Sequence, residues 1–171
     1  MRKIRKNVFE TNSSSTHSVC ISGEKELDNP NLPISDENNK VLARFGEFGW
    51  EIENYSDQET KLSYLLTMIA ETSYRKENKC DFYELDDFKM VQDVICEYCK
   101  CDGIEIYGDF EVKRDSWDGK EYYYLDFDGY IDHQSHEDYS CLQDFLDDYG
   151  VTIEEFIFSP DVILHTDNDN H

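Results

Sequence analysis

The sequence predicts an α+β fold with a mainly antiparallel sheet and about three helices, in a single domain over residues 1–171. Three observations lead to this prediction. Apolar residues recur with helical spacing in three segments. An Asp-Gly pair separates two aromatic-rich runs that alternate in the manner of strands. The chain has 171 residues, an ordinary size for one domain.

The composition indicates a folded chain despite its low apolar content. Only 39% of the residues are hydrophobic and 32% are charged. Acidic disordered chains share such values, but they are poor in aromatic residues. Here 14% of the residues are aromatic, and each ring buries a large area. We therefore expect a core built mainly from aromatic side chains.

The helices are predicted from the spacing of apolar residues. The clearest helix covers residues 59–74, where four apolar residues fall at i, i+3, i+4 and i+7: Leu62, Leu65, Leu66 and Ile69. Similar stripes predict helices at about 84–100 and at 140–149. Thr152 is expected to cap a short helical turn at 153–156.

Strands are predicted near both ends of the chain. Residues 1–9 and 17–22 carry β-branched and aromatic residues, and a last strand at 162–165 leads into a polar tail at 166–171. Residues 23–40 are rich in Pro, Asn, Asp and Glu, which predicts a loop.

A hairpin is predicted in the second half of the chain. Two runs, at 110–112 and 122–127, flank the Asp-Gly pair at 118–119, which is a strong hairpin signal. A short strand or turn is expected within 41–50, which contains Gly46 and Gly49.

The charge of the chain restricts its partners. Thirty-nine acidic residues against sixteen basic ones give a net charge of -23. Nucleic acids and anionic membranes carry the same sign, so direct binding to either is not expected. No run of apolar residues is long enough for a membrane span. The first six residues are predominantly basic, as at the start of a signal peptide, but the apolar region of a signal peptide does not follow them. We expect a cytoplasmic protein whose cysteines are thiols.

A basic, nucleic-acid-binding protein is the partner that this charge favours. Carboxylates on a rigid face would replace phosphates and pair with Arg and Lys of the target. The carboxylates expected to make these contacts lie in the second half of the chain: Asp118, Glu121, Asp126, Asp128, Glu137, Asp138, Asp144, Asp147 and Asp148.

A Ser-rich segment between the first two predicted strands is a candidate phosphate-binding loop. Hydroxyl groups can hold phosphate oxygens, and the candidates are Ser13, Ser14 and Ser15. His17 follows as a candidate base or metal ligand. The alternative is an ordinary polar turn. The segment lacks glycine, so it is not a P-loop.

A second candidate segment lies at 126–138, where two histidines and five acidic residues fall within thirteen positions. In a hydrolase, the catalytic candidates would be His17, Asp132 and His133, and the metal ligands would be His17, Asp132, His133 and His136. Such mixtures suit a divalent metal such as Mn or Mg. The alternative is a solvated acidic loop without any cofactor. Carboxylates at 167–169 could join this site, or belong to a frayed terminus.

The cysteines do not match a zinc site. Cys96, Cys99 and Cys101 form one close group on a predicted helix, whereas structural zinc needs four ligands at matched spacing. We expect thiols that pack against the core.

Two segments resemble a group of uncharacterised bacteriophage and mobile-element proteins. The match lies in the Phe-Glu-Thr-Asn-Ser-Ser-Ser-Thr-His-Ser run at 9–18 and in Gly-Tyr-Ile-Asp-His-Gln-Ser at 129–135. It covers about a fifth of the chain and implies phage origin. It also implies that the two segments share one site, but it carries no catalytic assignment.

Two functions are consistent with these features. The first is a phage-encoded inhibitor that acts by acidic mimicry of nucleic acid on a host defence protein, such as a CRISPR nuclease. It needs no cofactor. The alternative is a metal-dependent phosphodiesterase or nucleotide hydrolase that uses the Ser-rich and Asp-His segments. The absence of a recognisable enzyme motif favours the inhibitor.

Overall fold

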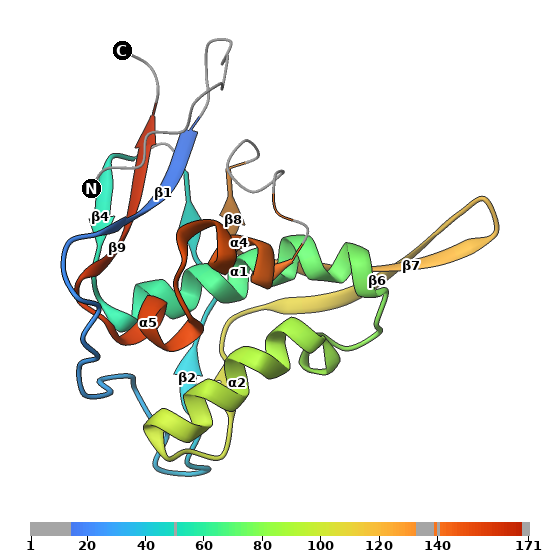
Figure 1. Ribbon diagram of the computed structural model, residues 1–171. Helices are drawn as coiled ribbons and strands as arrows, with labels where there is room; N and C mark the ends of the chain where they lie inside the picture. The colour runs from blue at the N-terminus through green and yellow to red at the C-terminus, as the bar shows by residue number, and fades with distance from the viewer. Residues whose placement is uncertain (1–14, 50, 133–138, 140, 169–171) are drawn as a thin grey trace.

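The computed structural model of the chain describes residues 15–49, 51–132, 139 and 141–168. The mixture of helices and small, largely antiparallel sheets confirms the predicted α+β class (Figure 1). The elements are β1 (Ser15–Ile21), β2 (Val41–Ala43), β3 (Glu47–Phe48), β4 (Glu53–Tyr55), α1 (Gln58–Glu77), α2 (Asp86–Cys99), β5 (Ile104–Ile106), β6 (Phe110–Trp117), β7 (Lys120–Phe127), β8 (Tyr130–Ile131), α4 (Leu142–Tyr149), α5 (Ile153–Phe158) and β9 (Val162–Asn168).

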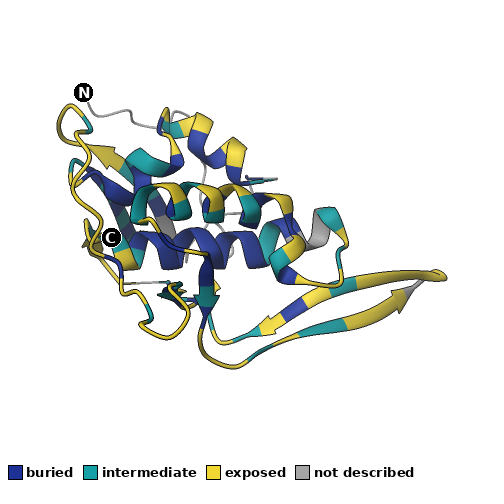
Figure 2. Cartoon of the chain, turned by 90° about the horizontal axis from the view of Figure 1, so that it is seen from below, coloured by how far each residue is buried: buried dark blue, intermediate teal, exposed yellow. Residues whose placement is uncertain are grey.

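Helix α1 is the centre of the core. It contacts α2, α4, α5, β2, β7 and β8, and every residue from 61 to 70 is buried (Figure 2). The apolar stripe correctly predicted a helix here, but the helix is buried on all faces. Its polar residues are accommodated by hydrogen bonds: the Ser63 hydroxyl donates to the Arg44 carbonyl at 2.8 Å, and the Thr67 hydroxyl donates to the Ser63 carbonyl at 2.8 Å.

Aromatic rings fill much of the space around α1, as the composition predicted. The Phe45 ring packs edge-to-face against Phe82 at 5.4 Å and against Phe110 at 5.7 Å between ring centroids. Farther along, Phe48 packs edge-to-face on Tyr64 at 4.9 Å. Such contacts add stability beyond the area that they bury.

The predicted strands at 17–22 and 162–165 pair with each other as β1 and β9. The three-stranded sheet has the order β1-β9-β4, and both pairings are antiparallel. The predicted tail at 166–171 is wrong in its first part, because β9 continues to Asn168. Thr166 is buried, pairs with His17 on one side and Glu53 on the other, and donates its hydroxyl to the Glu51 carbonyl at 2.6 Å.

The predicted element within 41–50 consists of two short strands, each in a parallel pair. Strand β2 pairs with β5, and β3 pairs with β8. The two parallel pairs lie beside α1, and the link between β2 and β3 runs across it. The loop predicted at 23–40 is confirmed, apart from an isolated bridge between Ile34 and Val41.

The predicted hairpin is confirmed and projects from the body of the molecule (Figure 1). Asp118 and Gly119 have φ of 50° and 75°, and a turn with positive φ at both central residues matches the twist of its strands. The other edge of β7 is held by Asn78 at the end of α1. Tyr123 donates its backbone N–H to Asn78 Oδ1 at 3.0 Å, and Asn78 Nδ2 donates to the Glu121 carbonyl at 3.0 Å.

The predicted helices at 84–100 and 140–149 are α2 and α4, each slightly shorter than expected. The predicted turn after Thr152 is a six-residue helix, α5. Thr152 caps it as expected: Thr152 Oγ1 accepts from the Glu155 N–H, and Glu155 accepts from the Thr152 N–H.

Candidate functional site

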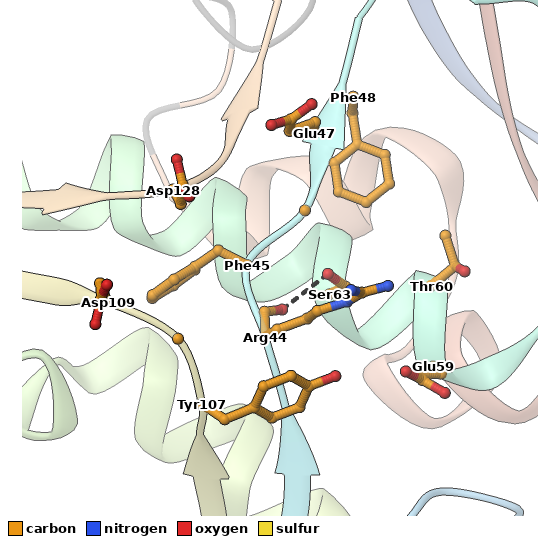
Figure 3. Close-up of a pocket in the computed structure, with 12 residues that line it drawn as sticks. Arg44, Phe45, Glu47, Phe48, Glu59, Thr60, Ser63, Tyr107, Asp109 and Asp128 are labelled. Carbon is orange, nitrogen blue, oxygen red and sulfur yellow. Dashed lines mark hydrogen bonds between the residues drawn. The ribbon is translucent and has the colours of Figure 1, made fainter.

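Two adjoining hollows lie at the base of the hairpin. The first, of about 490 Å³, lies between the β2–β3 link, the start of α1 and the residues that follow β5 and β7 (Figure 3). The second, of about 500 Å³, lies between the first residues of β6 and the last residues of β7. Gly108, Asp109 and Asp128 line both hollows. We call the two hollows together the acidic groove.

The floor of the groove depends on the close approach of two glycines. Tyr130 donates its backbone N–H to the Gly46 carbonyl at 2.9 Å, and a Cβ on Gly129 would lie 2.8 Å from that carbonyl oxygen. A Cβ on Gly46 would lie 2.5 Å from Phe48. Thr67 Oγ1 also accepts from the Gly46 N–H at 2.9 Å. The β2–β3 link is therefore fastened to α1 and to β8.

Carboxylates outnumber cations along the groove. Six carboxylates line it against one guanidinium, that of Arg44. The acidic residues come from four separate segments: Glu47, Glu59, Asp109, Glu111, Asp126 and Asp128. A cleft lined by one sign of charge concentrates its field and attracts ions of the opposite sign. The groove is therefore suited to a cationic ligand.

One aromatic ring on the wall of the groove is accessible. Tyr107 is 45% exposed, whereas Phe45 is buried in the core beneath it. Figure 3 shows Tyr107 on one side of the hollow, with Asp109 and Asp128 on either side of Phe45. The Tyr107 ring points towards the Arg44 side of the hollow, away from Asp109 and Asp128 (Figure 3).

The carboxylates predicted for partner binding on the hairpin differ in their availability. Asp126 is paired with Lys113, and Glu121 is paired with Arg114 at 3.0 Å. Two of the predicted contacts are therefore balanced within the chain. Asp118 lies exposed in the turn, and Asp128 lines the acidic groove.

The remaining predicted partner contacts lie elsewhere. Asp144, Asp147 and Asp148 are exposed on α4, which lies on the body of the molecule while the hairpin projects from it (Figure 1). Asp147 accepts from Gln143 at 2.7 Å, and Asp148 accepts from the Tyr139 hydroxyl at 3.3 Å. Glu137 and Asp138 lie outside the described residues.

His17 lies on the inner face of its sheet, 6% exposed. Its Nδ1 is 3.4 Å from the Tyr64 hydroxyl, and its carbonyl accepts from the Tyr149 hydroxyl at 3.3 Å. Burial, and then the nearby Tyr149 and Glu71, raise the pKa of Tyr64 far above its ordinary value. Tyr64 therefore stays protonated, and its hydroxyl can donate to the imidazole.

Asp132 directly follows β8. Its backbone N–H donates to the Phe48 carbonyl at 2.9 Å, and the preceding Ile131 N–H donates to Glu71 at 3.1 Å. Phe48 also packs on Tyr64. Phe48 therefore contacts both the backbone of Asp132 and the ring of Tyr64, the tyrosine that lies beside His17.

The other predicted members of the hydrolase site are placed differently or lie outside the described part. Ser13, Ser14, His133 and His136 are outside it, and only the backbone of Ser15, at the start of β1, is described. Asp167 lies on the face of the sheet opposite His17, because side chains alternate along β9. Thr166 is the residue paired with His17, and Asp167 approaches His165 at 3.8 Å. Asp167 therefore does not join His17.

Cys96, Cys99 and Cys101 lie around the end of α2 as free thiols. Burial, followed by the neighbouring Cys101, raises the pKa of Cys96 and of Cys99 to about 11. The Cys101 thiol lies 3.5 Å from the Gly103 carbonyl. Among the described residues, no group of three or more potential ligands gathers around a metal position.

Sequence patterns did not single out several residues of the groove, such as Glu47, Glu59, Tyr107 and Asp109. They are distant in the chain and meet only through the parallel strand pairs, so no local spacing marks them. No protein-family model, curated protein or solved structure matches this chain. None of the helices in the described ranges has the length and apolar character required to cross a bilayer.

Proposed function

We propose that the protein binds a basic, nucleic-acid-binding protein and occupies its nucleic-acid site, as an acidic inhibitor encoded by a phage and acting on a defence protein in the host cytoplasm. The single observation that carries this proposal is the acidic groove, where six carboxylates face one guanidinium. A rigid, concave, negatively charged surface complements the Lys and Arg side chains that hold phosphates in such a partner.

The overall charge supports the same proposal. A net charge of -23 directs the protein towards cationic surfaces and away from nucleic acids. Two of the three cations of the hairpin, Lys113 and Arg114, are also paired with carboxylates of the chain itself. Among the described residues, Arg44 is the one cation that lines the groove, so a bound partner would supply the cations that balance its carboxylates.

We expect the complex to compete with DNA or RNA and to weaken steeply with salt. Immobilised protein would capture the partner from host lysate, and the purified partner would then be titrated with labelled nucleic acid with and without the protein. Displacement of the nucleic acid, and an affinity that falls about tenfold or more between low and moderate salt, are the expected results. A partner that keeps its nucleic acid while bound to this protein would refute mimicry.

The metal-dependent hydrolase is a second candidate, favoured by the buried His17, whose Nδ1 lies 3.4 Å from the Tyr64 hydroxyl. If it is correct, cleavage of a nucleotide or phosphodiester with Mn or Mg should fall about 100-fold or more in His17→Ala. The matched control is His165→Ala, because His165 lies on the outer face of the same sheet. Equal loss in both variants, or no cleavage by the wild type, would remove this candidate.

A further inference from the structure

We propose that Cys96 and Cys101 form a redox-active pair that closes to an intrachain disulfide by exchange with a small-molecule disulfide such as oxidised glutathione. The two cysteines lie at the end of α2, where the chain turns towards β5. Neither residue lines the acidic groove, so this inference goes beyond the proposed function and does not depend on it.

The turn that ends α2 brings the two thiols together. Lys100 directly follows the helix and is left-handed, with φ of 57° and ψ of 44°. A left-handed residue at this position reverses the chain, so the next side chain packs against the last turn of the helix. Cys101 is that next residue. Its thiol lies 3.8 Å from the Ile95 carbonyl oxygen and is hydrogen-bonded to the Cys96 thiol. Thiols in direct contact can be bridged with little movement of the backbone.

The difference in exposure between the two thiols sets the order of the reaction. Cys96 is half-buried, whereas Cys101 is 8% exposed and its thiol also lies 3.5 Å from the Gly103 carbonyl oxygen. A small disulfide can therefore reach Cys96 first. The Cys96 thiolate attacks one sulfur of the small disulfide, breaks its S–S bond and releases one thiolate, which takes up a proton.

The second step closes the pair. Cys101 loses its proton and attacks the Cys96 sulfur of the mixed disulfide, which forms the Cys96–Cys101 bond and releases a second small thiol. The two cysteines together lose two electrons, and the small disulfide is reduced to two thiols.

Cys99 lies on the same turn of α2 and is the competing partner. It is close enough to Cys96 and Cys101 for both to raise its pKa, but the hydrogen bond between thiols joins Cys96 to Cys101. This contact assigns the disulfide to Cys96 and Cys101 and leaves Cys99 as a thiol.

The rate of oxidation should depend on pH. Burial raises the pKa of Cys96 to about 11, and Cys101, Asp93 and Asp102 act in the same direction. Because the thiolate is the attacking form, the rate should rise about tenfold per pH unit between pH 7.5 and 9.5. A thiol with an ordinary pKa of about 8.5 would level off within this range.

The experiment uses the full chain as the variant Cys20→Ser/Cys80→Ser, which removes the two exposed thiols and so prevents links between molecules. The protein is incubated with oxidised glutathione, the remaining thiols are alkylated, and tryptic peptides are identified by mass spectrometry. Trypsin cuts after Lys100, so the peptides of Cys96 and Cys101 stay together only if a disulfide joins them. We expect this linked pair, and its loss on addition of a reducing agent.

Two further variants in the same background test the roles of the residues. Cys99→Ser should form the link at a rate within about threefold of the parent variant. Cys101→Ser should stop at the mixed disulfide, with one glutathione on Cys96. If the buried substitution at Cys101 unfolds the protein, the peptide map of the parent variant still decides the assignment.

Three results would count against the pair. Cys96 and Cys101 that remain alkylated under conditions that oxidise the urea-unfolded chain would overturn the inference. A link through Cys99 would overturn the assignment of the partners. A rate that does not rise between pH 7.5 and 9.5 would show that Cys96 is not the attacking thiol.

Discussion

The variant Asp87→Ala should lose about 2 to 4 kcal/mol of unfolding free energy, measured by urea denaturation. Asp87 lies in the first turn of α2 and is buried. Its Oδ2 accepts from the Ser73 hydroxyl at 2.5 Å and from the Leu142 backbone N–H at 3.1 Å. One carboxylate therefore joins α1, α2 and α4, and alanine would leave two buried donors without an acceptor.

The position of Leu142 explains why the expected loss is large. Leu142 begins α4, and its N-cap, Cys141, makes no side-chain cap hydrogen bond. Asp87 thus supplies from another helix the acceptor that a capping residue would normally supply. The negative charge is also favourable beside the first turn of both helices.

Two comparisons separate this role from a general effect of charge. Asp87→Asn keeps one acceptor oxygen and should lose less than the alanine variant. Asp86→Ala removes the adjacent, exposed carboxylate, which is paired with Lys79, and should cost less than about 1 kcal/mol. Equal losses in Asp86→Ala and Asp87→Ala would contradict the capping role.

The second large effect concerns Lys61, whose contribution to stability should depend on pH. Lys61 is fully buried in α1, and its Nζ donates to the carbonyls of Ser159 and Val162 at 2.8 and 3.2 Å. Burial lowers the pKa of Lys61 to about 8, although Asp57 and Asp28 act in the opposite direction. In the unfolded chain its pKa returns to about 10.4.

The sign of the effect follows from these two values. Between pH 8 and about 10.4, the unfolded chain binds the proton of Lys61 more strongly than the folded chain, so the contribution of Lys61 to stability rises with pH. From pH 7.5 to 9.5, the wild type should gain about 1 to 2 kcal/mol relative to Lys61→Met, which keeps the aliphatic stem without the charge. Cys96 and Cys99 titrate in both proteins, so their opposite contribution cancels in the difference.

Urea denaturation of both proteins at the two pH values measures this difference. The control is Lys89→Met, because Lys89 is a half-exposed lysine paired with Glu84. Its difference from the wild type should stay constant within about 0.5 kcal/mol. A constant difference for Lys61→Met as well would mean that Lys61 is not desolvated in the folded protein.

Local sequence patterns were sufficient to predict the elements that are specified by residues close together in the chain. The spacing of Leu62, Leu65 and Leu66 marks α1 because a helix repeats every 3.6 residues. Asp118 and Gly119 mark the hairpin because few residue pairs accept positive φ twice. Thr152 and Glu155 mark the start of α5 through their reciprocal bonds.

The remaining features of the fold depend on contacts between residues that are distant in the chain. The parallel pairs of β2 with β5 and of β3 with β8 have no local signal, because a parallel register is defined only by two separate segments. Likewise, the end of β9 was mistaken for a tail, since polar Thr166 is buried only through its pairing with β1 and β4.

The candidate site was likewise predictable from the sequence only in part. The amino-acid composition alone establishes that the surface is acidic, because the net charge of -23 does not depend on the fold. Which carboxylates are balanced depends on three-dimensional neighbours: strand pairing gives Asp126 and Glu121 cations from β6, whereas Asp109 and Asp128 line the groove and form no ion pair with the described residues. The alternation of side chains along β9 likewise places Asp167 on the face opposite His17. Total charge is a sum over residues, but a binding site depends on distances, and tertiary packing sets those distances.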